Sequence, residues 1–264
     1  MKKFFAIMAV LVLFSSCSEY QKAIKSEDVA VKTEIANKLY DAGKYSKAIR
    51  LYEQIVPAYK GKPQAEKIFY NYSQALYKEK QYYTAGYQFE SFASMYPKSD
   101  KVEETVFLGA KCYGKLSPVY TLDQTDTYKA IEKMQLYIDR FPDGANFAEA
   151  NEIAKALRNK LEKKAFEIAK QYNLIMNYKS AIVALDNFVI DFPGTPYKED
   201  ALFYRLDSAY NLAINSIPEK MLERLNVAKI SYANLMKFDA STKYKKTADE
   251  MLARIDKDLQ QFSK

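Results

Sequence analysis

The stretch YKSAIVALDNFVIDFP, from Tyr178 to Pro193, carries an alanine twelve residues before a proline that follows an aromatic residue. The same spacing recurs in the pairs Ala85 with Pro97 and Ala130 with Pro142. Ala48 and Ala228 stand in similar contexts without the proline, so related alanines return every 37 to 51 residues. A motif that returns at such intervals indicates a helical repeat array, in which each unit packs on its neighbours.

The rest of the chain agrees with an all-helical fold. It has only seven glycines and eight prolines, and strand-like alternation is nowhere sustained. Each aromatic-proline step closes a helix, because the residue before proline is pushed out of the α region. The expected helices span 28–42, 45–59, 64–79, 82–96, 101–116, 125–141, 147–175, 178–191, 197–215, 219–238 and 242–262. They resemble tetratricopeptide repeats, so we predict an α-solenoid of about five helix pairs plus a C-terminal capping helix.

The first residues have the pattern of a secretory signal. Two lysines precede an apolar run from Phe4 to Phe14, which is too short to cross a bilayer as a helix. The run leads into Phe14-Ser-Ser-Cys17, which resembles the lipobox of bacterial lipoproteins. We therefore expect lipidation at Cys17 and attachment to a membrane through its acyl chains. Ordinary secretion with an incidental cysteine is the alternative. Ser18 after the anchor favours the outer membrane.

The chain is expected to divide into five segments. Residues 1–16 are the lipoprotein signal peptide, and 17–27 are a short, polar, lipid-anchored tether. N-terminal repeats fill 28–146, a long connecting helix spans 147–175, and C-terminal repeats with the capping helix fill 176–264. The third pair carries an insertion over 117–127, where other pairs have only a short turn. Insertions in solenoids project from one face, often a binding face.

The insertion motif carries the most specific resemblance to a known family. Its residues are Leu122, Asp123, Gln124 and Thr125, followed by Asp-Thr-Tyr-Lys-Ala-Ile. With the segment CSEYQK at 17–22 and the aromatic-proline repeat ends, the chain resembles the BamD family, lipoproteins of the outer-membrane β-barrel assembly (Bam) machinery. The resemblance implies a scaffold on the outer membrane, facing the periplasm. Its implied partners are unfolded β-barrel proteins, received by the N-terminal repeats, and the POTRA domains of a BamA-like barrel protein, docked on the C-terminal half.

Tyrosines crowd the second pair beyond what two helices need for packing. They are Tyr70, Tyr72, Tyr77, Tyr82, Tyr83 and Tyr87. An aromatic lining would suit an aromatic-rich targeting strand, so these six are the candidate peptide-binding residues. The alternative is that they are core positions, since aromatic stripes at helical spacing usually pack inside. Asp123 and Thr127 are expected to order the insertion through hydrogen bonds to nearby backbone.

Other functions find little support in the sequence. The chain has no histidine, and it carries no nucleophile motif, metal-ligand cluster or glycine-rich phosphate loop, so no catalytic residue, metal or cofactor is expected. The net charge is +7 but the charges are interspersed, which argues against nucleic-acid binding. Zero tryptophan disfavours a glycan-capturing repeat lipoprotein. A generic periplasmic repeat scaffold, acting in envelope or peptidoglycan and division coordination, is the alternative function.

Overall fold

The computed structural model of the protein describes residues 19–59, 62 and 65–262. Its elements are helical throughout these ranges, and the expected all-α array of helix pairs is confirmed. The chain divides into two compact units. Unit 1 contains the chain up to Leu157 except 119–122, and unit 2 contains 119–122 with everything from Arg158 onward. The division falls inside the long helix.

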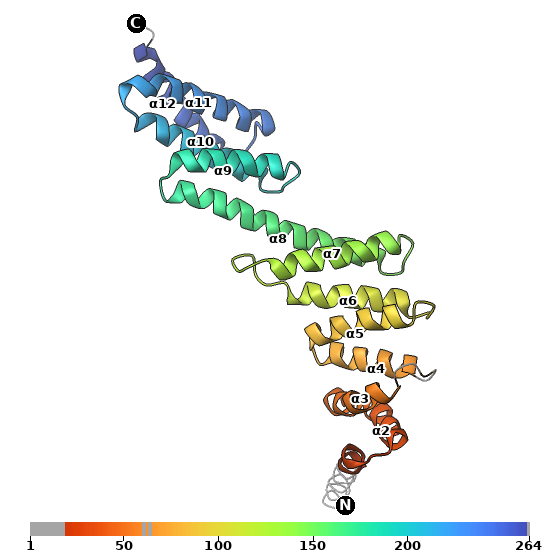
Figure 1. Ribbon diagram of the computed structural model, residues 1–264. Coiled ribbons are helices and arrows are strands. Elements are labelled where there is room, and N and C mark those ends of the chain that lie inside the picture. The colour runs from red at the N-terminus through yellow and green to blue at the C-terminus, as the bar shows by residue number, and fades with distance from the viewer. Residues whose placement is uncertain (1–18, 60–61, 63–64, 263–264) are drawn as a thin grey trace, which may run out of the picture. The chain divides into compact units, whose positions relative to one another are not determined.

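Unit 1 is a stack of antiparallel helices in chain order (Figure 1). Its helices are α2 (Val29–Asp41), α3 (Tyr45–Tyr59), α4 (Ala65–Lys78), α5 (Tyr82–Met95), α6 (Val102–Leu116), α7 (Thr125–Arg140) and the first part of α8 (Phe147–Leu174). From α2 to α7, each helix packs on the next along the chain. The turns within the first two pairs need a left-handed residue, supplied by Gly43 at φ 69° and Lys80 at φ 60°.

Unit 2 repeats the arrangement with the second part of α8 and the remaining helices. These are α9 (Tyr178–Asp191), α10 (Lys198–Ile214), α11 (Pro218–Phe238), α12 (Lys245–Leu259) and the short 3₁₀ helix η1 (Gln260–Phe262). Helices α9, α10 and α11 pack in sequence, and α12 closes the unit against α10 and α11. It is the expected capping helix.

The repeated alanines explain why the pairs form. Ala48, Ala85, Ala130, Ala181 and Ala228 are all fully buried. A methyl side chain lets two helices approach closely, and larger aromatic and aliphatic residues fill the space on either side. The expected helix ends also hold, because Tyr96, Phe141 and Phe192 are the C-cap residues of α5, α7 and α9.

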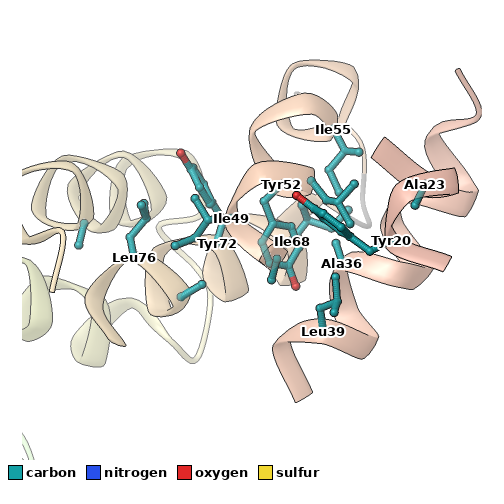
Figure 2. Close-up of a cluster of buried hydrophobic side chains, with 14 of the residues drawn as sticks. Tyr20, Ala23, Ala36, Leu39, Ile49, Tyr52, Ile55, Ile68, Tyr72 and Leu76 are labelled. Atoms are coloured by element: carbon teal, nitrogen blue, oxygen red, sulfur yellow. The ribbon is translucent and has the colours of Figure 1, made fainter. Parts of the chain in front are cut away.

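The segment expected to be a tether is folded where the structure describes it. Residues 19–25 form a helix, with Tyr20 7% exposed and Ala23 fully buried. In Figure 2, Tyr20 reaches from this helix into the cluster that holds Tyr52 and Ile55. The part of 17–27 after Glu19 is therefore the first layer of the array's core.

Candidate functional site

Four of the six candidate tyrosines are held in packing contacts inside unit 1. Tyr72 is only 6% exposed, and its ring lies 6.1 Å from that of Tyr52. The Tyr70 hydroxyl donates to Glu104 Oε1 over 2.9 Å. Tyr77 and Tyr82 pack edge to face with ring centroids 5.8 Å apart. These four side chains serve the stack, as expected for core positions.

Tyr83 and Tyr87 differ from the other four because they face solvent. They lie one turn apart on α5 and are 73% and 61% exposed. Two exposed tyrosines on one helix form an apolar and hydrogen-bonding surface that no neighbour covers among the described residues. They remain candidates for contact with a ligand, as aromatic side chains often anchor partners.

Two hollows lie along α5, and together we call them the α5 groove. The first has a volume of about 550 Å³ and is lined by Val56, Pro57, Phe69, Tyr87, Gln88, Glu90, Ser91, Ser94 and Met95. The second has a volume of about 610 Å³ and is lined by Glu90, Ala93, Ser94, Val106, Ala110, Lys133, Leu136, Asp139 and Arg140. Hollows of this size are within the range that ligand sites occupy. Glu90 and Ser94 line both, so the two hollows adjoin along α5.

The charges of the α5 groove centre on Glu90. Its Oε1 lies 2.8 Å from Lys133 Nζ, and its Oε2 accepts from the Tyr113 hydroxyl over 3.3 Å. Burial, and then the neighbouring Glu90 carboxylate, raise the pKa of Tyr113 to about 12, so the phenol keeps its proton and donates. Glu90 is thus held between two partners and presents a fixed polar group between the two hollows.

The walls of the groove combine exposed apolar and charged side chains. Leu136 is 54% exposed and Met95 37%, although both line hollows. Arg140 is exposed in the second hollow and makes no ion pair with a described residue. Leu136, Met95 and Arg140 were not singled out in the sequence, because their spacing on α5 and α7 is that of any amphipathic helix.

The insertion motif is ordered by its own side chains: the expected bond to backbone is present at Asp123, whereas the Thr127 hydroxyl bonds to other side chains instead. Asp123 Oδ1 accepts from the Thr125 backbone N–H over 2.9 Å. Thr127 is fully buried, and its hydroxyl donates to Gln124 Oε1 over 2.8 Å and lies 2.6 Å from the Ser117 hydroxyl. These bonds fix the chain where it leaves the insertion and enters α7.

Replacing Thr127 with valine is expected to lower the free energy of unfolding by about 1–2 kcal/mol. The substitution keeps the volume but removes a buried hydroxyl that bonds to both Gln124 and Ser117. Thr125→Val is the matched control, since Thr125 is exposed and only its backbone N–H bonds to Asp123. Urea denaturation checks both variants. Equal losses would mean that the buried hydroxyl is not what holds the insertion.

The tip of the insertion belongs to unit 2, where it packs on α8. Lys163 Nζ lies 4.4 Å from the centroid of the Tyr120 ring, and Lys164 Nζ donates to the Leu122 carbonyl over 2.5 Å. A hollow of about 550 Å³ lies beside the tip, walled on α8 by residues that include Ile168 and Tyr172. This hollow was not foreseen, because the sequence does not reveal which helix an insertion packs on.

Unit 2 also exposes large apolar side chains. On α9 and α11 these are Val183, Ile190, Leu222, Ile230 and Phe238, each 44% exposed or more. Both helices pack on α10. Exposed apolar groups scattered singly are ordinary, whereas a contiguous patch of them marks an interaction surface. Cys17, the expected lipidation site, lies outside the described residues.

The buried tyrosines predict how stability depends on pH. Burial raises the pKa of Tyr70 and Tyr72 to about 12, above their ordinary value of 10.0. A raised pKa means that the folded state holds the proton more tightly, so this stabilisation is complete below pH 10 and is lost as pH rises towards 12. The denaturation midpoint is therefore expected to fall from pH 10 upward, and less so in Tyr72→Phe. A midpoint unchanged up to pH 12 would contradict this.

Two further properties concern the residues that the structure describes. No group of three or more cysteine, aspartate or glutamate side chains among them is placed to hold a metal ion. Across 19–59, 62 and 65–262, no helix has both the length and the apolar character that crossing a bilayer requires.

Comparison with known proteins adds one informative match. A family model described as "YfiO: Outer membrane lipoprotein" matches residues 30–225. None of the curated proteins compared with the chain matches it. Among solved structures, a Podosopora anserina kinesin-light-chain protein with nearly identical TPR-like repeats is 15% identical, at a TM-score of 0.33, covering 82% of this chain and 98% of its own. The TPR2AB domain of yeast Sti1 in a complex with pHSP90 is 15% identical, at a TM-score of 0.38, covering 86% of this chain and 98% of its own.

Proposed function

Because the chain belongs to the YfiO family of outer membrane lipoproteins, which is the BamD family, we propose that it is a scaffold subunit of the outer-membrane β-barrel assembly machinery. The family and the stacked helix pairs are of a protein-interaction type. In this role the protein binds other proteins and catalyses nothing. It receives unfolded β-barrel proteins and docks on a BamA-like partner for their insertion.

The α5 groove is the proposed receiving site for unfolded barrel proteins. Transmembrane β-strands alternate apolar and polar side chains and carry aromatic residues near both membrane interfaces. In an extended chain, alternate side chains point the same way about 7 Å apart. Two adjoining hollows with Tyr87, Met95 and Leu136 on their walls can take such side chains, and Glu90 and Lys133 offer polar groups to the peptide backbone.

Unit 2 is the proposed docking surface for the POTRA domains of a BamA-like barrel protein. The exposed apolar residues of α9 and α11, among them Val183, Ile190 and Ile230, support this assignment. An interface core is depleted of charge and rich in such side chains. The acylated Cys17 would hold the protein on the outer membrane, facing the periplasm, where both partners are present.

Co-purification from native membranes tests this function. A tagged protein, solubilised with its lipid anchor in mild detergent, is expected to bring down a barrel protein with POTRA domains. The matched variant Val183→Glu with Ile190→Glu should lose this partner, whereas Tyr83→Ser with Tyr87→Ser on α5 should keep it. Recovery of peptidoglycan or division proteins, with no POTRA-containing partner, would favour the generic envelope scaffold.

A further inference from the structure

The helix at residues 19–25 is fixed to the array on one side. Tyr20 and Ala23 are buried (Figure 2). Ile24 is partly buried and packs against the same core cluster. These positions follow the i, i+3, i+4 spacing of one helix face. The cluster includes Ala36 from α2 and Ile49 from α3, so the helix caps the first pair.

Polar contacts hold the two edges of this helix. Glu19 Oε2 lies 2.8 Å from Lys38 Nζ on α2, and the hydrogen bond from Lys38 lowers the pKa of Glu19. Lys47 Nζ, on α3, lies 5.4 Å from the centroid of the Tyr20 ring. The helix is therefore tied to both members of the first pair, and its orientation on them is fixed.

The opposite face of the helix is basic and uncovered. Gln21, Lys22 and Lys25 are exposed. Neither lysine makes an ion pair with a described residue. Lys22 and Lys25 are three residues apart, so their side chains project from the same side of the helix, away from Ala23.

The sequence places this basic face next to the expected lipid anchor. Only two residues separate Cys17 from Tyr20, so the two Cα atoms are at most about 11 Å apart. That distance is about one Debye length at 0.1 M salt. Acyl chains buried in the bilayer hold their attachment residue at the interface. Lys22 and Lys25 lie about 3 and 7.5 Å further along the helix axis than Tyr20, at 1.5 Å per residue, so their ammonium groups are within reach of the charged lipid headgroups.

We propose that residues 19–25 form a membrane-facing cap, in which Lys22 and Lys25 bind anionic phospholipid headgroups while Tyr20 and Ala23 hold the cap on the first helix pair. The inference rests on the proposed acylation of Cys17. The first repeat is then fixed against the bilayer instead of swinging on a flexible tether. Membrane binding through one lipid anchor becomes stronger when a basic patch lies beside the anchor.

Quenching by labelled lipids tests this arrangement. The mature protein purified from membranes, carrying Gln21→Cys with a fluorophore, is reconstituted in phosphatidylcholine vesicles with or without 30 mol % phosphatidylglycerol (roughly the anionic content that gives a strong surface potential). The vesicles contain headgroup-nitroxide lipid as quencher. Cys112 is fully buried and burial raises the pKa of its thiol to about 12, so the label goes to position 21.

Strong quenching is expected in the anionic vesicles and weaker quenching in the neutral ones. Lys22→Gln with Lys25→Gln should lower the ratio of docked to undocked protein by about 25-fold, about fivefold per lysine. The matched control removes two exposed lysines of α11, Lys220→Gln with Lys237→Gln, and should quench like the parent. Equal quenching in both double variants, or in both lipid mixtures, overturns the headgroup assignment.

Flotation of the same vesicles tests the lipid anchor at Cys17 separately from the membrane-facing cap. Protein that floats with vesicles but remains unquenched overturns the cap and leaves the lipid anchor standing. Protein that does not float at all overturns the acylation of Cys17, and the cap with it.

Discussion

Replacing Arg205 with methionine is expected to lower the free energy of unfolding of unit 2 by about 2–3 kcal/mol. Arg205 is on α10, and its Nε and Nη2 donate to the two carboxylate oxygens of Asp186 on α9, over 2.6 and 3.2 Å. Its Nη1 donates to the Ser231 hydroxyl on α11. The Arg205 side chain, 16% exposed, therefore joins three helices, and the side chain of its partner Asp186 is 43% exposed. Removing Arg205 breaks three hydrogen bonds, two of them to a carboxylate, and hydrogen bonds to charged groups contribute more stability than neutral ones.

Two further variants separate the loss of the paired hydrogen bonds between Arg205 and Asp186 from the loss of a positive charge alone. Arg205→Lys should recover only part of the stability, because an ammonium group cannot make the bidentate contact. Lys229→Met removes the Lys229–Asp256 pair, whose members are 53% and 45% exposed, and should cost less than about 1 kcal/mol. Guanidinium denaturation measures all three. A loss in Arg205→Met no larger than in Lys229→Met would show that α9, α10 and α11 are held by apolar packing alone.

The combined replacement Tyr87→Ser with Leu136→Ser is expected to weaken binding of a barrel-derived C-terminal peptide by at least about 30-fold. These exposed side chains line the two hollows of the α5 groove, and truncating a binding hot spot costs about 2 kcal/mol or more. Both are surface residues, at 61% and 54% exposure, so the fold should be unaffected. Fluorescence anisotropy of a labelled peptide gives the dissociation constants.

A matched variant on other parts of unit 1 controls for the loss of apolar surface. Tyr128→Ser with Val31→Ser removes side chains that are 63% and 41% exposed and that line neither hollow. Peptide binding should be unchanged in this variant. If both double variants bind as the parent does, the groove is not the receiving site. If both weaken alike, binding follows general surface hydrophobicity.

The sequence predicts helices well where apolar periodicity and aromatic-proline ends agree. The expected bounds 45–59 and 178–191 are those of α3 and α9. The last helix begins later than its expected start at 242, at Lys245. The reason is that Thr242 is buried and its hydroxyl donates to Glu199. This contact keeps the residues just before Lys245 in a turn. No local pattern reveals a contact with a residue so far away in the chain.

The candidate site was harder to predict than the fold. On α4 and α5, aromatic residues occur on both the packed and the exposed faces, so the sequence cannot separate Tyr72 from Tyr87. The walls that α3 and α7 contribute to the α5 groove depend on how neighbouring repeats stack. The sequence of a single helix does not reveal that stacking. A usable signal was present at residues 19–25, where Tyr20, Ala23 and Ile24 have the spacing of a buried helix face within a polar segment.

Site-specific photo-crosslinking in growing cells tests the central claim most directly, that the α5 groove receives unfolded outer-membrane proteins. A photo-reactive amino acid replaces Leu136 in the groove or, as the control, the similarly exposed Tyr128 outside it. Adducts with newly made β-barrel proteins are expected at Leu136 and should disappear when synthesis of these proteins is stopped. The control position should give few or none. An absence of barrel-protein adducts at Leu136, or equal yields at both positions, would contradict the claim.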